Sequence, residues 1–151
     1  MALFNVFDIS ASGLTAERLR MDVISNNIAN VNTTRTVEGG PYKRQRVIFE
    51  PRGEQVGFIF PAIFSDKAKR VNQFQGVRVT QITNDPSPAR LVYDPGHPDA
   101  DENGYVHMPN VNIVQEMVDM ISATRAYEAN VTAINSAKQM AAKALDILKN
   151  N

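Results

Sequence analysis

The chain has 151 residues, of which 43% are hydrophobic and 21% are charged, and its 16 Lys and Arg balance 16 Asp and Glu. That length suits one ordinary domain or one small domain with extended elements, and the lack of cysteine excludes disulfides, thiolate metal sites and cysteine nucleophiles. A neutral chain lacks the basic excess that releases counterions from phosphates, so we expect no nucleic-acid partner.

The first residues, MALFNVFDISASG, have no basic segment and only a short apolar run, which Asp8 and Ser10 interrupt. This is not the pattern of a cleaved secretory signal. No stretch reaches the ~18 uninterrupted apolar residues of a membrane helix, so we expect no membrane span. These features favour a cytosolic protein or one exported without a cleaved signal peptide.

Apolar residues recur every seven positions near the N-terminus and predict an amphipathic helix. Two neighbouring rows contain Phe7, Leu14, Met21 and Ile28, and Ile9, Ala16 and Val23. Gly13 should weaken this helix by about 1 kcal/mol relative to alanine. The amides and hydroxyls of VISNNIANVNTT, residues 23–34, compete for backbone hydrogen bonds and should end the helix near Asn30.

Residues 39–109 hold most of the glycines and prolines, and short β-type runs alternate there with turn signals. We expect strands at RVIFE, VGFIF, VRVTQIT and RLVYD, and little order in SDKAKRVNQFQG, residues 65–76. The basic run YKRQR, residues 42–46, is most simply a solvated or partner-facing loop.

One acidic segment, Asp99–Gly104, matches the opening of an EF-hand calcium loop. Position twelve of that loop needs a bidentate glutamate but is Asn110, so an acidic turn is the preferred interpretation. His97 and His107 lack a zinc-binding spacing. Since no nucleophile motif is present either, we expect no metal, no cofactor and no catalytic residue.

No glycine or proline follows Pro109, and a second heptad pattern predicts a long helix there. Its apolar face contains Ile113, Met120, Tyr127, Ile134, Ala141 and Leu148, with Met117, Val131, Leu145, Ala123, Ala137 and Ala144 beside them. Asn110 or Asn112 can cap its start. Some forty residues make a rod of about 60 Å, longer than a domain of this size would bury on itself.

The sequence therefore predicts the α+β class: long N- and C-terminal helices form a coiled-coil-like core, and the middle region is small and β-rich. The corresponding segments are 1–36, 37–109 and 110–151. Two packings remain open, because the helices can pack on the middle region as one domain or pair in a larger assembly. Glu116, Asn130 and Lys138 lie among the apolar positions, where polar groups fix the register of helical assemblies, and so favour the second packing.

Both ends of the chain also resemble a known family. ASGLTAERLRMDVISNNIANVNTTRT, residues 11–36, resembles the N-terminal motif of the axial proteins of the bacterial flagellum. MPNVNIVQEMVDMISATRAYEANVTAINSAKQMAAKALDIL, residues 108–148, resembles its C-terminal partner. The blocks GGPYKRQRVIFEP and YDPGHPDADENGYVHMPNVN are similar to the C-type proximal-rod branch of this family.

The resemblance implies a non-enzymatic structural subunit of the flagellar basal-body rod, which spans the periplasm and transmits torque for motility. Its implied partners are copies of itself, other rod proteins, basal-body components and the flagellar type III export apparatus, which would export it without a cleaved signal peptide. The terminal helices of such subunits are typically disordered before assembly. The alternatives are another rod or hook-basal axial subunit and, from a different class, a cytosolic coiled-coil adaptor.

We expect the subunit interface on the two terminal segments. Short amides carry both donors and acceptors, so the Asn cluster suits a buried contact with the backbone of adjacent subunits, and a simple helix cap is its alternative. Tyr127 most simply belongs to the core, whereas Arg125 and Glu128 can pair with a neighbouring helix. The expected interface residues are Leu14, Met21, Asn26, Asn27, Ile28, Asn30, Asn32, Thr33, Met117, Met120, Arg125, Tyr127, Glu128, Asn130 and Ile134.

Overall fold

The computed structural model describes residues 2–53 and 75–149. Its elements are helix α1 (Ala2–Ala29), strands β1 (Gln45–Pro51), β2 (Val77–Asn84), β3 (Arg90–Tyr93) and β4 (Tyr105–Met108), and helix α2 (Ile113–Lys149). The predicted α+β class, with long terminal helices around a small β-rich middle, is confirmed. The expected strand VGFIF and the stretch 65–74 lie outside the described residues.

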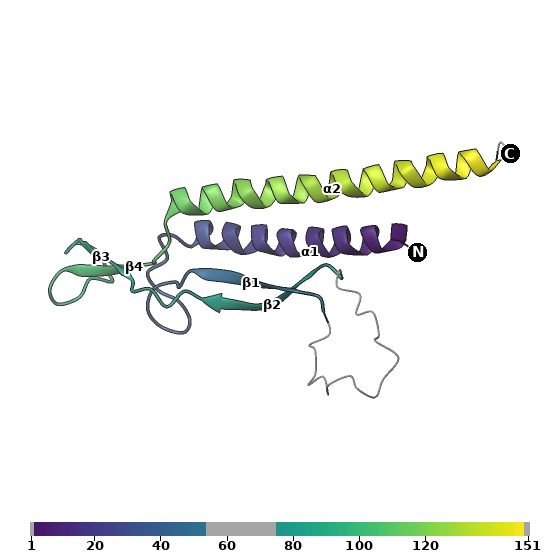
Figure 1. Cartoon of the computed structure of the whole chain (residues 1–151). Helices are drawn as coiled ribbons and strands as arrows, with labels where there is room; N and C mark the ends of the chain where they lie inside the picture. Colours follow the sequence, from purple (N-terminus) through teal and green to yellow (C-terminus); the bar gives the residue numbers. More distant parts are fainter. Residues whose placement is uncertain (1, 54–74, 150–151) are drawn as a thin grey trace, which may run out of the picture.

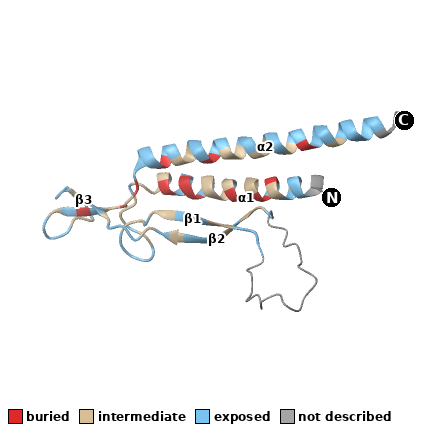
Figure 2. Ribbon diagram, in the orientation of Figure 1, coloured by how far each residue is buried: buried red, intermediate tan, exposed pale blue. Residues whose placement is uncertain are grey.

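The protein has three layers over most of its length (Figure 1). α1 and α2 lie side by side and antiparallel, and the hairpin of β1 and β2 packs on α1. A second hairpin, β3 and β4, extends from the end at which α2 begins. Buried residues gather on α1, whereas long stretches of α2 are exposed (Figure 2). The middle region therefore packs on α1 and leaves one side of α2 uncovered.

Small residues bring the two helices together. Ala123 and Ala137 of the predicted α2 face are buried. A Cβ atom on Gly13 would lie 2.9 Å from Nδ2 of Asn130, so this glycine permits close helix approach. Met117 and Leu145 of the same predicted face are exposed: Met117 lies on the side of α2 that faces away from α1, and Leu145 lies where α2 extends past the N-terminal end of α1.

The β1–β2 hairpin is antiparallel and turns its apolar side toward α1. Val47 pairs with Ile82 and Phe49 with Val79, with an irregularity in the register between Ile48 and Phe49. This bulge keeps Val79 and Ile82 on one face despite their odd spacing. The guanidinium of Arg20 on α1 lies 6.0 Å from the centre of the Phe49 ring.

Side-chain amides end the helices as the sequence predicts. α1 stops at Ala29, and Nδ2 of Asn30 donates to the carbonyl oxygen of Asn26 at 2.9 Å. At the start of α2, Oδ1 of Asn112 accepts from the N–H of Val114 at 3.0 Å. Asn112 is therefore the cap, and Asn110 has another role, described below.

Strand β4 was not among the expected strands, because its YVHM run lies between the turn-forming residues of DADENG and Pro109. The segment Asp99–Gly104 joins it to β3 as an acidic turn, closed by the Gly104 N–H, which donates to the Asp101 carbonyl at 2.8 Å. Asp99 accepts from the Thr34 hydroxyl at 2.8 Å and lies 2.7 Å from Arg35. The interpretation of this segment as a turn is confirmed.

Neither helix, over its described length, is both long and apolar enough to cross a membrane. Across residues 2–53 and 75–149, no three His, Cys, Asp or Glu side chains are grouped so that they could hold a metal ion.

The close approach at Gly13 gives a testable prediction. Gly13→Ala should lower the free energy of unfolding by about 1 kcal/mol, because overpacking against Asn130 outweighs the gain in helix propensity. Urea unfolding followed by circular dichroism measures the change. Adding Asn130→Ala should restore stability, and a Gly13→Ala variant more stable than the parent would contradict the packing described.

Candidate functional site

A fully buried carboxylate lies where the three layers meet. Glu116, in the first turn of α2, has an exposed fraction of 0%. Its Oε1 accepts from Nε of Arg44 at 2.6 Å, and its Oε2 accepts from Nδ2 of Asn27 at 3.0 Å. Arg44 immediately precedes β1 and Asn27 lies in the last turns of α1, so this one side chain connects three elements.

Arg44 holds further carboxylates around itself. Its guanidinium lies 3.3 Å from Asp119 and 3.6 Å from Asp85, and its side chain is only 17% exposed. Its backbone N–H donates to Oδ1 of Asn110 at 3.0 Å. Burial opposes the charge, but the hydrogen bond to Glu116 and the neighbouring carboxylates outweigh it and raise the pKa of Arg44.

The side-chain amide of Asn27 pairs with the backbone of Gln45 as a neighbouring strand would. It is 1% exposed, and its Nδ2 donates to the Gln45 carbonyl at 2.9 Å while its Oδ1 accepts from the Gln45 N–H at 2.9 Å. The Tyr42 hydroxyl also donates to this oxygen at 2.9 Å. Every donor and acceptor of the amide is therefore used, and the free edge of β1 is closed at its first residue.

Two ionisable groups at the rim have shifted pKa values. Burial and the negative charge of Glu116 raise the pKa of Tyr42, against the opposing effect of its hydrogen bond with Asn26. Hydrogen bonds from the hydroxyl and backbone of Ser87 lower the pKa of Asp85, and the nearby arginines add to this effect. The shifts favour a neutral phenol at Tyr42 and an ionised carboxylate at Asp85, which are the forms that make these hydrogen bonds and ion pairs.

This geometry corrects two interpretations of the sequence. The basic run at residues 42–46 is only partly solvated: Arg44 binds Glu116 and Asp119 within the chain, whereas Lys43 and Arg46 are exposed. Glu116 does not mark an intermolecular contact either, since its partners are Arg44 and Asn27 of the same chain. The sequence did contain a signal, because a charged residue such as Glu116 in an apolar helix face requires an opposite charge. Nothing in the sequence identified Arg44 as that partner.

The opposite side of α2 carries an exposed apolar surface, which we call the outer face. Its residues are Val114, Met117, Val118 and Ile121. Helical spacing places Arg125 and Glu128 further along the same side, where they form an exposed ion pair of 3.0 Å. Within the described residues no other element covers the outer face.

The expected interface residues divide into three groups. Asn27 is buried, and its hydrogen bonds are intramolecular. The half-buried residues are Leu14, Met21, Ile28, Asn30, Thr33, Met120, Tyr127, Asn130 and Ile134. The exposed residues are Asn26, Asn32, Met117, Arg125 and Glu128.

Comparison with known proteins gives matches at both ends of the chain. Residues 7–35 match the family described as "Flagella basal body rod protein". Residues 102–147 match the family described as "Flagellar basal body rod FlgEFG protein C-terminal".

Relatives match over nearly the whole length, and each is named flagellar basal-body rod protein FlgC. The protein from Borreliella burgdorferi is 56% identical over 153 residues, covering 99% of either chain. The one from Bacillus subtilis is 48% identical and covers 99% of this chain and 100% of its own. The one from Salmonella typhimurium is 38% identical, with 97% and 98% covered.

The buried ion pair predicts a large effect of Arg44→Met. Leaving the Glu116 carboxylate buried without its partner should cost about 3 kcal/mol of unfolding free energy. Arg35→Met is the matched control, because Arg35 pairs with Asp99 at a side chain that is 79% exposed and should cost less than about 1 kcal/mol. Combining Arg44→Met with Glu116→Leu should recover much of the loss. Equal effects of the two arginine substitutions in urea unfolding would contradict this account.

The raised pKa of Tyr42 predicts an alkaline effect. The folded protein favours the neutral phenol of Tyr42. The phenol's contribution to the free energy of unfolding is therefore complete below the ordinary pKa of 10.0, and it is lost as the pH rises through the higher pKa of the folded state. The stability difference between the parent and Tyr42→Phe should therefore shrink above about pH 10. Tyr93→Phe, at an exposed tyrosine, is the control, and a difference independent of pH would disprove the effect.

Proposed function

Since the chain belongs to the FlgC family of flagellar basal-body rod proteins, and is thus a structural subunit of that rod, we propose that it assembles through its terminal helices with copies of itself and with other rod proteins. The observation that carries this proposal is the outer face of α2, which is apolar and has no cover within the described chain. An exposed apolar ridge beside a packed helix pair is typical of a protein interface.

We assign different roles to the expected interface residues. Met117 contributes apolar area to the interface, and Arg125 with Glu128 supplies charges that fix the register. Asn32 is exposed just after α1 and can contact backbone groups of a neighbour, whereas the exposed Asn26 already hydrogen-bonds Tyr42 and Asn30 within the chain. Asn27 has its hydrogen bonds inside the chain and supports this surface by holding β1 and α2 against α1.

The same proposal includes the position and route of the subunit. It lies in the proximal rod of the basal body, transmits torque there, and is exported by the flagellar type III apparatus without a cleaved signal peptide. It is a structural protein and not an enzyme. The part of α2 without an internal partner gains its final order on assembly, whereas the region of the Glu116 network is folded before it.

A deletion strain tests the rod function. Without the gene, cells should be non-motile and electron microscopy should show basal bodies that lack a complete rod. The gene on a plasmid should restore both. Motile deletion cells with complete rods would refute the proposal.

The state of the isolated protein distinguishes the rod subunit from a cytosolic coiled-coil adaptor. Circular dichroism of the rod subunit should show partial helicity that rises on association. A single cooperative melt with full helicity at all concentrations would instead favour the adaptor.

Charge on the outer face should block assembly. Met117 is 56% exposed, so Met117→Glu should leave the helicity of the purified protein unchanged but abolish motility and rod formation, because it places a carboxylate in a desolvated contact. Val37→Glu, at a fully exposed loop residue away from the helices, is the control and should preserve motility. Normal rods in the Met117→Glu strain would exclude this face from the interface.

A further inference from the structure

Strand β1 directs every second residue of its backbone away from its partner β2. The carbonyl of Arg44, just before β1, accepts from the N–H of Asp85 at 2.7 Å. The N–H of Arg52, just after β1, donates to the carbonyl of Gly76 at 2.8 Å. The extra residue of the bulge lies in β2, so the alternation along β1 is unbroken. Even-numbered residues of β1 therefore face β2, and the odd-numbered ones direct their N–H and C=O groups to the other edge.

Asn27 closes this other edge only at Gln45. Its amide donates to the Gln45 carbonyl and accepts from the Gln45 N–H, both at 2.9 Å, which are the two bonds that a residue of an adjacent strand would make. Val47 and Phe49 are the next residues with the same orientation. Among residues 2–53 and 75–149, no hydrogen bond occupies their outward backbone groups. The edge beyond Asn27 is therefore open to a further strand.

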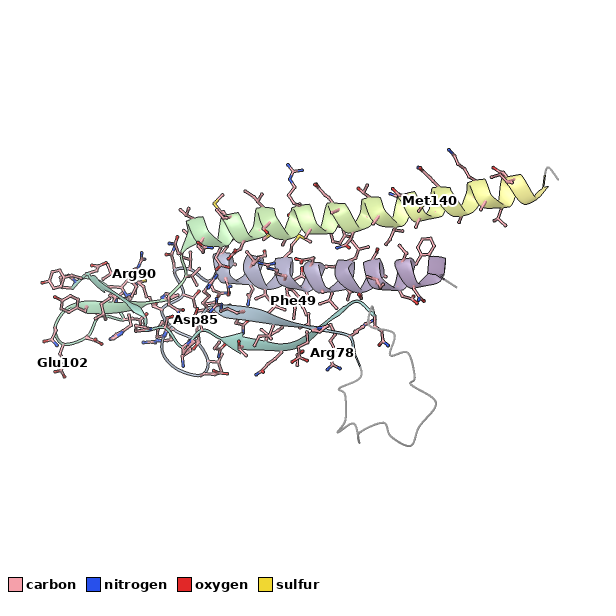
Figure 3. All side chains as sticks on the ribbon, in the orientation of Figure 1. Phe49, Arg78, Asp85, Arg90, Glu102 and Met140 are labelled. Atoms are coloured by element: carbon pink, nitrogen blue, oxygen red, sulfur yellow. The ribbon has the colours of Figure 1, made fainter. Side chains whose placement is uncertain are left out.

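The open edge forms one wall of a groove. The groove has a volume of about 470 Å³ and lies between β1, one flank of α1 and the first turns of α2. Val47 and Phe49 line it from β1, and Gln115 and Asp119 line it from α2. The Phe49 side chain lies between β1 and α1 (Figure 3), against Arg20. Because both helices bound the groove, it offers room beside β1 for one extended segment and not for a whole hairpin.

The free charge of the groove is positive. Glu116 and Asp119 are already bound by Arg44, at 2.6 and 3.3 Å. Arg20 and Arg46 also line the groove, and their side chains are 33% and 61% exposed. The carboxylates nearest to these two arginines lie 3.8 and 3.7 Å away, too far for a hydrogen bond. Both guanidinium groups therefore keep donors for a further carboxylate.

We propose that the open edge of β1 binds an extended, acidic segment of another rod protein, which joins the β1–β2 hairpin as a third strand. The backbone of the segment pairs with Val47 and Phe49, and a carboxylate of the segment binds Arg20 or Arg46. Each strand of the described chain is already paired within a hairpin, so the added strand comes from a different protein. The inference rests on the proposed rod function and identifies one contact within it.

Photo-cross-linking in assembled basal bodies tests this contact. A benzophenone amino acid in place of Gln115, an exposed residue of the groove, should cross-link to another rod protein, and mass spectrometry should locate the link in an acidic segment. Val47→Pro should reduce the yield of this cross-link several-fold, because it removes the outward N–H and leaves the bonds of β1 to β2 in place. Val47→Ala is the matched control, since it keeps the N–H, and should preserve the yield.

Charge reversal tests the arginines separately. Arg46→Glu should also reduce the cross-link yield several-fold, because it repels the carboxylate of the added strand. Arg78→Glu is its control and should preserve the yield. Arg78 is a similarly exposed arginine of the same hairpin that points away from α1 (Figure 3) and does not line the groove.

The outcomes separate this contact from the rod function itself. Motile Val47→Pro cells with complete rods and an unchanged cross-link would overturn the added strand and leave the rod function intact. Cross-links only to a second copy of this chain, or equal losses in Val47→Pro and Val47→Ala, would overturn it too. If the Val47→Pro protein does not fold, the two arginine variants decide, and equal yields from them would overturn the contact.

Discussion

The carboxylate of Glu116 is the constraint on which the arrangement of this chain depends. It is fully buried, and a charge in that position is tolerated only with an opposite charge and enough hydrogen bonds. Arg44 and Asn27 provide them from the segment before β1 and from α1. A buried side chain of this group without its partner would destabilise the fold. The network therefore favours the arrangement of α1, β1 and α2 in which Glu116, Arg44 and Asn27 are all hydrogen-bonded.

Polar and apolar side chains have different roles in this protein: the polar ones fix the arrangement of its elements, and the apolar ones of the outer face remain exposed. The buried polar network is complete within one chain and gives the helix pair and hairpin a single register. The apolar outer face of α2 is not covered by the described chain. A subunit of a rod needs both properties: the network fixes how α1, β1 and the start of α2 are arranged, and the apolar surface still loses water when neighbours arrive.

Local and periodic features were predictable because they depend on neighbouring residues. The heptad spacing gave both helices, and the amide-rich cluster and Asn112 gave their ends, since caps act on the adjacent turn. The resemblance at both ends of the chain indicated the family. Identities of 56% and 48% to FlgC proteins over nearly the full length confirm it. Strand β4 was missed because its short run is enclosed by turn-forming residues and Pro109, which mark a loop in the sequence.

The sequence by itself determined the two helices, their caps, the β-rich middle and the rod family. Only the tertiary structure decided that Arg44 is the partner of Glu116, that Asn27 closes the edge of β1, and that Gly13 makes room for Asn130. The physical reason is the separation along the sequence over which each interaction acts. Periodicity and capping act within a few residues, whereas a buried charge can be paired by any opposite charge that folding brings near it, and here Arg44 lies 72 positions away along the chain.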